Sequence, residues 1–290
     1  MRVLITGCNG QVGHCLTERF KNKADILALD RKELDITNQQ AVIKTVSEFN
    51  PDYIINAAAH TAVDRAEEEI ELSYAINRDG PKYLAVAAQQ VNAVMLHIST
   101  DYVFDGEGEQ PYVESDQTSP QGIYGQSKLA GEQAVAESCA EHLILRTAWV
   151  FGEQGNNFVK TMLRLAQSRD ELSIVGDQFG GPTYAGDIAD ALITMVQYLD
   201  QGNQAKWGIY HFSGMPYASW FDFASAIFQA TEQHDVLTKQ PKLLAIPTSA
   251  YPTPAKRPAN SRLDCSKIEN QFAIKSSDWN AALNNIQAYK

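Results

Sequence analysis

The chain of 290 residues has little of what several classes of protein require. It contains no Cys-x-x-Cys pair, and its four cysteines are scattered at Cys8, Cys15, Cys139 and Cys265. Neither a disulfide framework nor a zinc site is therefore expected, and a reducing compartment suits the chain. Basic residues are outnumbered, with 24 Lys and Arg against 35 Asp and Glu. This balance excludes a general nucleic-acid binder, which needs a basic face.

Long apolar runs and a secretory leader are also missing. No apolar run approaches the ~18 residues of a membrane-spanning helix, so no membrane contact is expected. Residues 1–7 enter a strand-like segment without a charged leader or a small-residue cleavage site, and we expect a cytoplasmic protein. Apolar residues, at 44%, are plentiful. They suffice for one large domain or two small ones.

Short apolar segments alternate with helical patterns through the first 150 residues. Strand-like runs lie at residues 3–5, 26–29, 53–57, 94–98 and 143–146, and helical spacing at 12–21, 38–49, 81–91 and 124–138. Nearly continuous apolar strands of this length are typical of a parallel sheet covered by helices on both faces. The sequence therefore predicts an α/β fold with a Rossmann-type, doubly wound parallel sheet in residues 1–150.

The alternation loosens after residue 150. Helical patterns continue at residues 156–168, 185–200 and 219–233, and five prolines lie between positions 241 and 258. We expect residues 151–290 to form mainly a smaller, irregular α/β lobe that binds substrate. The helix at 185–200 is expected to return to the first domain.

A glycine-rich turn, G-x-x-G-x-x-G, joins the first predicted strand to the first predicted helix. Small residues let the backbone approach a pyrophosphate, and the start of the helix supplies N–H donors. The turn predicts a dinucleotide site built by Gly7, Gly10, Gln11, Val12 and Gly13.

The end of the second strand bears on the choice of cofactor. Asp30 favours NADH, because a carboxylate accepts hydrogen bonds from the adenosine ribose and repels a 2′-phosphate. Arg31 and Lys32 follow at once and can pair with that phosphate. Both NADH and NADPH therefore stay open. Asp35 and Ile36 are predicted to line the adenine pocket.

Tyr124 and Lys128 form a Y-x-x-x-K pair at the start of a predicted helix. Side chains four residues apart share one face of a helix. Two unit charges ~4 Å apart attract by ~4 kcal/mol at an effective dielectric constant of ~20. We therefore expect Lys128 to lower the pKa of Tyr124 by ~3 units toward neutrality. A tyrosine of that kind is a competent general acid.

Thr100 lies where the chain leaves the fourth predicted strand. Ligand sites in open α/β sheets lie beyond the carboxyl ends of the strands. The Thr100 hydroxyl is therefore expected to hydrogen-bond a substrate carbonyl beside Tyr124.

These motifs together resemble the extended short-chain dehydrogenase/reductase superfamily, and within it the dTDP-4-dehydrorhamnose reductase family. The resemblance covers essentially the whole chain. Its most specific segments are Ser99-Thr100-Asp101-Tyr102-Val103-Phe104 and Arg146-Thr147-Ala148-Trp149-Val150-Phe151-Gly152.

The resemblance implies NAD(P)H-dependent reduction of dTDP-4-dehydro-β-L-rhamnose to dTDP-β-L-rhamnose. Tyr124 would be the general acid, Lys128 would hold the cofactor ribose, and Thr100 would orient the ketone. It also implies that Ala57, Ala58 and Ala59 pass beside the dinucleotide, and that Asn77 matches a common helix asparagine. The substrate would be contacted by Thr100, Asp101, Trp149 and Arg257.

Relatives in the family have been associated with a divalent ion held by carboxylates between subunits. Cys15 stands where such a carboxylate is needed, so Mg²⁺ is doubtful and no metal ligands are nominated. Superfamily members often dimerise, and a homodimer is compatible with the resemblance. Two alternatives stay open: another nucleotide-sugar reductase, epimerase or dehydratase, or a regulatory subunit that binds the cofactor without turnover.

Overall fold

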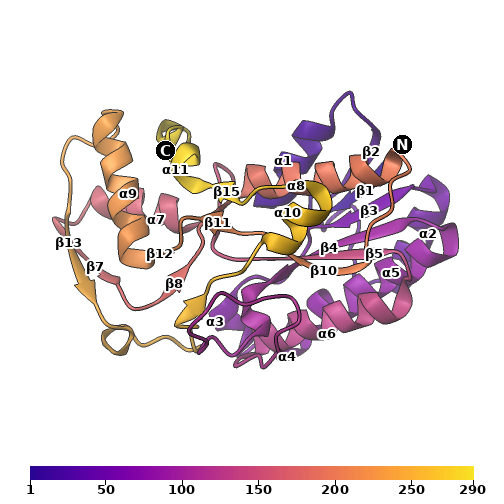
Figure 1. Cartoon of the computed structure of the whole chain (residues 1–290), viewed down its shortest axis with the longest axis horizontal. Coiled ribbons are helices and arrows are strands. Elements are labelled where there is room, and N and C mark those ends of the chain that lie inside the picture. Colours follow the sequence, from indigo (N-terminus) through magenta and orange to yellow (C-terminus); the bar gives the residue numbers. More distant parts are fainter.

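Six parallel strands form the central sheet of the computed structural model, which describes residues 1–290 (Figure 1). Their order across the sheet is β10-β5-β4-β3-β1-β2, and every neighbouring pair is parallel. The strands are β1 (Arg2–Thr6), β2 (Asp25–Leu29), β3 (Tyr53–Asn56), β4 (Val94–Thr100), β5 (His142–Thr147) and β10 (Gly208–His211). The predicted Rossmann-type sheet is confirmed.

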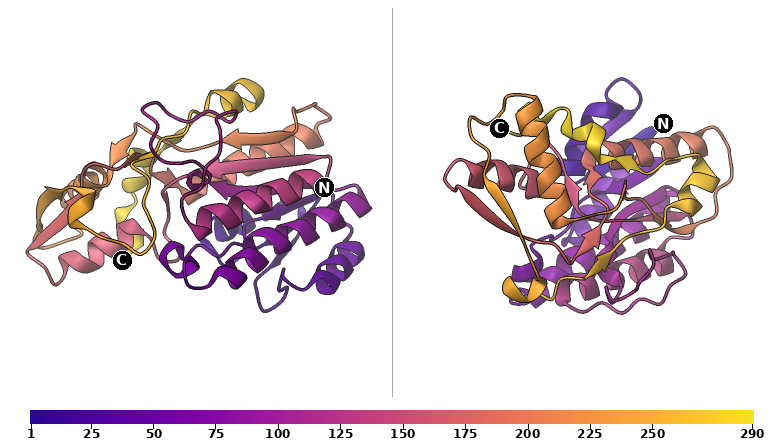
Figure 2. Two further views of the ribbon diagram at one scale, coloured as in Figure 1. Left: turned by 90° about the horizontal axis from the view of Figure 1, so that it is seen from below. Right: turned by 60° about the vertical axis from the view of Figure 1, so that its left-hand side comes forward.

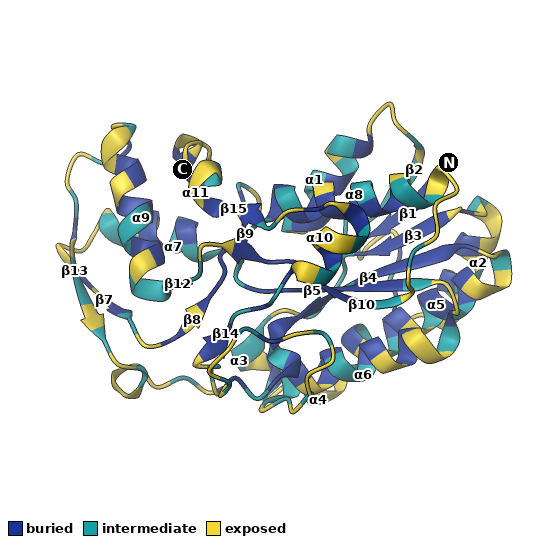
Figure 3. Cartoon of the chain, viewed as in Figure 1, coloured by how far each residue is buried: buried dark blue, intermediate teal, exposed yellow.

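Helices cover both faces of this sheet. One face carries α1 (Gln11–Phe20), α8 (Ala185–Asp200) and α10 (Ser266–Phe272), and the other carries α2 (Gln39–Phe49), α5 (Gly80–Val91) and α6 (Ile123–Ser138). Side chains alternate between the two faces, so Val3 and Ile5 pack under the first set and Leu4 under the second. Burial on both faces explains why the inner strands are mostly apolar, and these strands are largely dark blue in Figure 3. The edge strand β2 has no buried residue.

The sheet has its switch point beside β1. The chain runs from β1 to its neighbour β2 and then crosses to β3 on the other side of β1. In such a sheet a crevice opens beyond the carboxyl ends of the strands at this point. The Ala57 N–H donates to the carbonyl of Thr6 at 3.1 Å, so the loops that follow β1 and β3 lie side by side.

A smaller lobe lies beyond the carboxyl ends of the strands (Figures 1 and 2). Its apolar core is separate from that of the sheet and includes Phe151, Phe223 and Ile227. The lobe contains α7 (Phe158–Ala166), α9 (Trp220–Gln233), α11 (Trp279–Leu283), the parallel pair β7 (Glu171–Val175) and β13 (Lys242–Ile246), and a sheet of β12 (Ala218–Ser219), β8 (Phe179–Gly180) and β14 (Asn260–Ser261).

The remaining elements are short connections. They are α3 (Val63–Ala66), α4 (Ile70–Tyr74), the π-helix η1 (Ala75–Asp79), the 3-10 helices η2 (Asp101–Val103), η3 (Thr248–Ala250) and η4 (Ile286–Tyr289), and the strands β6 (Val150–Phe151), β9 (Thr183–Tyr184), β11 (Gly214–Met215) and β15 (Ser277–Asp278). No helix combines the length and the hydropathy that crossing a bilayer requires.

The second half of the chain returns to the sheet more often than the sequence predicts. Helix α8 packs against α1, at the positions expected for the returning helix. In addition, β10 extends the sheet beside β5, and α10 packs against α8 and β10. The residue range assigned to the second lobe therefore also supplies a strand and a helix to the first. The strand was missed because it is short and starts at a glycine, Gly208.

Candidate active site

The glycine turn brings the backbone close to the neighbouring loop at the switch point. Gly7 has φ +73°, and a Cβ atom there would lie 2.7 Å from the backbone of Ala58. A Cβ atom on Gly13 would lie 2.1 Å from the carbonyl oxygen of Gly7. Gly10 caps α1 without a side-chain hydrogen bond, so the first N–H groups of the helix are free of a side-chain cap. Only glycine fits at positions 7 and 13. The N–H groups at the start of α1 are suited to bind a pyrophosphate.

The residues predicted to hold the adenosine lie at the end of β2. Asp30 accepts a hydrogen bond from Asn9 Nδ2 at 2.9 Å and one from the Lys32 N–H at 2.7 Å. Asp35 is fixed by Thr37, whose hydroxyl donates to it at 2.7 Å and lowers its carboxyl pKa. Ile36 is buried and would contact a Cβ atom on Gly80, so it packs mainly against α5.

The loop after β3 is held by two buried asparagines. Asn56 Oδ1 accepts the N–H of Ala58 at 3.1 Å. Asn77, in the π-helix, accepts from the N–H of His60 at 2.8 Å and donates to the hydroxyl of Ser127 at 3.0 Å. Since Ser127 lies between Tyr124 and Lys128 on α6, Asn77 ties the predicted cofactor loop to the helix that carries those two residues. Its type alone did not signal this role.

The predicted catalytic residues come from β4 and α6. Thr100 ends β4, and Tyr124 and Lys128 lie one turn apart at the start of α6. The ring of Tyr124 is half-buried and packs edge-on against Tyr102, with centroids 5.4 Å apart. Lys128 is only 2% exposed, and its Nζ donates to the carbonyl of Ile98 at 2.6 Å. The end of β4 and the start of α6 thus bring all three residues to the carboxyl end of β4.

The structure does not bear out the expected lowering of the Tyr124 pKa. Burial raises the pKa of Tyr124, and a hydrogen bond with Thr100 only partly offsets it. Lys128 is not among the groups that shift it. Burial also lowers the pKa of Lys128 to about 8, although Glu132 supports its charge. Loss of hydration is therefore the largest influence on the pKa of both side chains, and the ammonium donates to the Ile98 carbonyl.

Asp101 lies inside the protein next to Thr100. It is 5% exposed, and its Oδ1 accepts the hydroxyl of Thr100 at 3.0 Å. Burial raises the pKa of its carboxyl to about 6. Asp101 is thus a partner of the Thr100 hydroxyl, and its predicted contact with the substrate stays a prediction.

Trp149 and Arg257 lie on the lobe side of the same region. The ring of Trp149 stacks on Trp220, with centroids 3.6 Å apart. Arg257 pairs with Asp64 through Nη2 and Oδ2 at 2.6 Å, and its guanidinium neighbours Tyr102. Trp220 was not predicted from the sequence, because a tryptophan at a helix start carries no motif.

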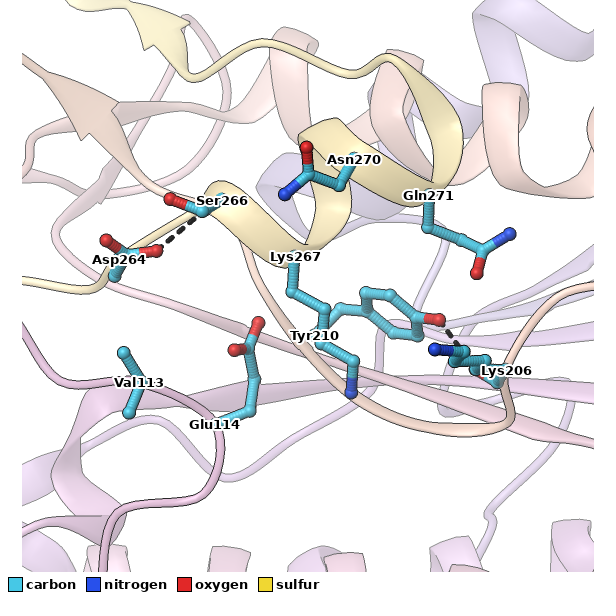
Figure 4. A pocket seen from close by; sticks show the side chains of 9 residues that line it. All are labelled: Val113, Glu114, Lys206, Tyr210, Asp264, Ser266, Lys267, Asn270 and Gln271. Carbon is cyan, nitrogen blue, oxygen red and sulfur yellow. Dashed lines mark hydrogen bonds between the residues drawn. The ribbon is translucent and has the colours of Figure 1, made fainter.

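A hollow of about 480 Å³ lies elsewhere, at the outer edge of the sheet, and none of the predicted site residues lines it (Figure 4). Lys267 Nζ donates to the Ile209 carbonyl at 2.6 Å, and Glu114 accepts the His211 N–H at 2.9 Å. These side chains occupy the backbone groups that the edge strand β10 turns outward, which blocks pairing with another strand. The hollow thus has a structural explanation.

The residues around Cys15 do not fit a divalent ion. The thiol pKa of Cys15 is raised by burial, which disfavours the thiolate that binds metals. The nearby Asp190 already pairs with Arg19, and no group of three or more His, Cys, Asp or Glu residues is arranged to hold a metal.

We therefore expect that removing divalent ions with a chelator leaves the activity of the protein unchanged. After dialysis against EDTA, the rate of cofactor oxidation should equal that of the untreated protein. A loss of activity that added Mg²⁺ restores would contradict this expectation.

Comparisons with known proteins identify the same family along essentially the whole chain. The family model described as RmlD substrate binding domain matches residues 1–289. A dTDP-4-dehydrorhamnose reductase of Aggregatibacter actinomycetemcomitans is 51% identical over 290 residues, covering 99% of each chain.

Solved structures agree with this result. A dTDP-4-dehydrorhamnose reductase of Clostridium acetobutylicum is 41% identical, with a TM-score of 0.91 over 99% of this chain and 98% of the other. The reductase of Bacillus anthracis in complex with NADP is 40% identical, with a TM-score of 0.89 over 98% of each chain. The chain therefore belongs to the dTDP-4-dehydrorhamnose reductase family.

Proposed function

We propose that the protein reduces the 4-keto group of dTDP-4-dehydro-β-L-rhamnose to give dTDP-β-L-rhamnose, with NADPH or NADH as the reductant. The observation that carries this proposal is the meeting of Thr100, Tyr124 and Lys128 beyond β4, close to the switch point where the glycine turn lies. Membership of the reductase family supports the choice of substrate.

The proposed chemistry needs a proton donor for the sugar oxygen. A nicotinamide cofactor, when bound, would supply the hydride for C4 of the sugar. Tyr124 then gives its phenolic proton to the oxygen that becomes an alkoxide. The raised pKa of Tyr124 keeps the phenol protonated at neutral pH, which is the state that an acid in the reductive direction requires. An alkoxide is a stronger base than a phenolate, so the transfer is still favourable.

Thr100 and Lys128 assist without changing protonation state. The Thr100 hydroxyl, held by Asp101 and by the Tyr102 N–H at 3.2 Å, is placed to orient the ketone. With a pKa of about 8, Lys128 stays mainly charged at pH 7, and its ammonium can donate to the cofactor ribose. Asn77 positions the helix that carries both Tyr124 and Lys128.

The adenosine end supports use of both cofactors. Asp30 can accept hydrogen bonds from the ribose hydroxyls of NADH, while Arg31 and Lys32 are exposed. We expect Arg31→Ala to raise the KM for NADPH about tenfold, as for loss of one charge-assisted hydrogen bond, and to leave the KM for NADH unchanged. Steady-state kinetics with each cofactor test this. Equal changes for both cofactors would remove Arg31 from phosphate recognition.

The location and assembly state complete the proposal. Four free cysteines suit a reducing cytoplasm, where nucleotide sugars are made. We propose a homodimer because members of the superfamily often dimerise. Light scattering of the purified protein gives its molar mass in solution and so tests this proposal.

The function itself is tested with the purified protein, either cofactor and dTDP-4-dehydrorhamnose. Oxidation of NADPH or NADH should depend on the sugar nucleotide, with dTDP-rhamnose as the product. No oxidation with this substrate, or equal oxidation without it, would refute the proposal.

A further inference from the structure

Two tryptophans join the sheet to the second lobe by direct stacking. Trp149 follows β5, the strand next to β4, and Trp220 is the first residue of α9. Their ring centroids are 3.6 Å apart, and the ring planes differ by only 11°. Both side chains stay partly exposed.

The backbone of Trp149 is held in a conformation that bulky residues rarely adopt. Its φ is +48°, in the left-handed region. Its carbonyl accepts the N–H of Thr183 at 3.1 Å. A Cβ atom on Gly180 would lie 2.6 Å from the indole, so only glycine fits beside the ring. Such backbone conformations persist where the surroundings over-determine them, and they cluster at ligand sites.

Trp220 is anchored within the lobe. Ser219 caps α9 by accepting the Asp222 N–H at 3.0 Å, and Asp222 accepts the Ser219 N–H in return, also at 3.0 Å. The Trp220 ring leans on Phe158, with centroids 4.7 Å apart, and packs against the core of the lobe. Because its backbone and ring are both fixed, Trp220 presents a rigid face to Trp149.

Trp149 also reaches the catalytic strand end. Its side chain packs against an apolar cluster that includes Val103 and Phe104, three and four residues after Thr100. The indole therefore contacts both this cluster and the ring of Trp220. A shift of Trp220 would be transmitted to the plane of the Trp149 ring.

We propose that Trp220 is a positioning residue for the sugar of the substrate, acting through the plane of Trp149. The inference rests on the proposed function, because it takes Trp149 as a contact of the deoxysugar. A 6-deoxyhexose has an apolar ring face and a methyl group, which pack well on an indole. Trp220 covers one face of Trp149 and Gly180 lies close against the indole as well, so the sugar meets the part of the ring that stays exposed. Trp220 should then affect binding of the sugar nucleotide and not binding of the cofactor or proton transfer.

Steady-state kinetics and circular dichroism of Trp220 variants test the inference. Trp220→Ala is expected to raise the KM for dTDP-4-dehydrorhamnose about tenfold, the loss expected for one aromatic stack, with kcat and the Kd for NADPH unchanged. Trp220→Phe, which keeps an aromatic ring, should have an intermediate KM. The matched control is Trp207→Phe, an exposed tryptophan outside the stack, which should behave as the wild type.

The stack also has a spectroscopic signature that requires no substrate. Two indoles this close couple their near-ultraviolet transitions, so the coupled dichroism signal should vanish in Trp149→Phe and in both Trp220 variants but persist in Trp207→Phe. If the signal vanishes and the KM of Trp220→Ala equals that of the wild type, the positioning role is overturned. A persistent signal in Trp220→Phe would overturn the stack itself.

Failure of the proposed function is a separate outcome. If the wild type does not oxidise NADPH with dTDP-4-dehydrorhamnose, that function fails, and quenching of tryptophan fluorescence by dTDP-rhamnose then measures sugar binding directly. Weaker binding by Trp220→Ala supports the positioning role, and equal binding overturns it.

Discussion

Replacing Tyr124 with phenylalanine is expected to lower kcat by ~10²–10⁴-fold, the range for loss of a positioned general acid. The variant lacks only the phenolic hydroxyl, so no donor remains for the sugar oxygen. The ring can still pack edge-on against Tyr102, as in the wild type. The Kd for NADPH should therefore stay unchanged, because no atom proposed to bind the cofactor phosphates has moved.

Stopped-flow or steady-state assays of NADPH oxidation measure this effect. Tyr210→Phe serves as the matched control, because it removes a phenolic hydroxyl that bonds only to the Lys206 carbonyl, at 2.6 Å. That variant should keep the wild-type kcat. A kcat for Tyr124→Phe within about threefold of the wild type, far below the expected range, would remove Tyr124 from the acid role.

Glu132→Ala is expected to lower the free energy of unfolding by ~3–5 kcal/mol, the usual effect of leaving one partner of a buried ion pair alone. Arg146 donates to Glu132 through Nε at 2.9 Å and through Nη2 at 2.7 Å. The two side chains are only 2% and 3% exposed. The substitution would strand a guanidinium between α6 and β5. It would also remove the carboxylate that supports the charge of Lys128.

Urea unfolding of the variant gives the free-energy change. The double variant Glu132→Leu with Arg146→Met removes both charges and should recover most of the loss, since no buried charge is then left unpaired. Glu171→Ala, which breaks the exposed pair with Lys242, should change stability by less than ~1 kcal/mol. A loss for Glu132→Ala no larger than this control would contradict the assigned role of the buried pair.

The elements of the sheet could be predicted because their signals are local. Runs such as Val3-Leu4-Ile5 are apolar since they are buried on both faces, and the glycine turn needs its residues at fixed positions. Tyr124 and Lys128 could also be predicted to share one helix face, because they are four residues apart in the sequence. Arg146 lies in one of the segments that carry the family resemblance and Glu132 lies four residues after Lys128, and only the fold shows that the two side chains meet.

What the sequence could not predict depends on contacts between distant residues. The pKa of Tyr124 is raised chiefly by burial, which is a property of the assembled site. Strand β10 depends on β5 for its place, because a four-residue segment from Gly208 has little pattern of its own. Trp220 gains its proposed role only from Trp149, 71 positions earlier in the chain. In each case the decisive partner lies far away in sequence.

Transfer of deuterium from cofactor to sugar tests the proposed reaction most directly. The protein is incubated with dTDP-4-dehydrorhamnose and NADPH that carries deuterium at the transferable position of C4, and the product is examined by NMR spectroscopy. We predict dTDP-rhamnose with deuterium at C4 of the sugar, formed by the wild type and only at trace rate by Tyr124→Phe. Cofactor oxidation that leaves no deuterium at that carbon, or a full yield of labelled product from Tyr124→Phe, would contradict the mechanism.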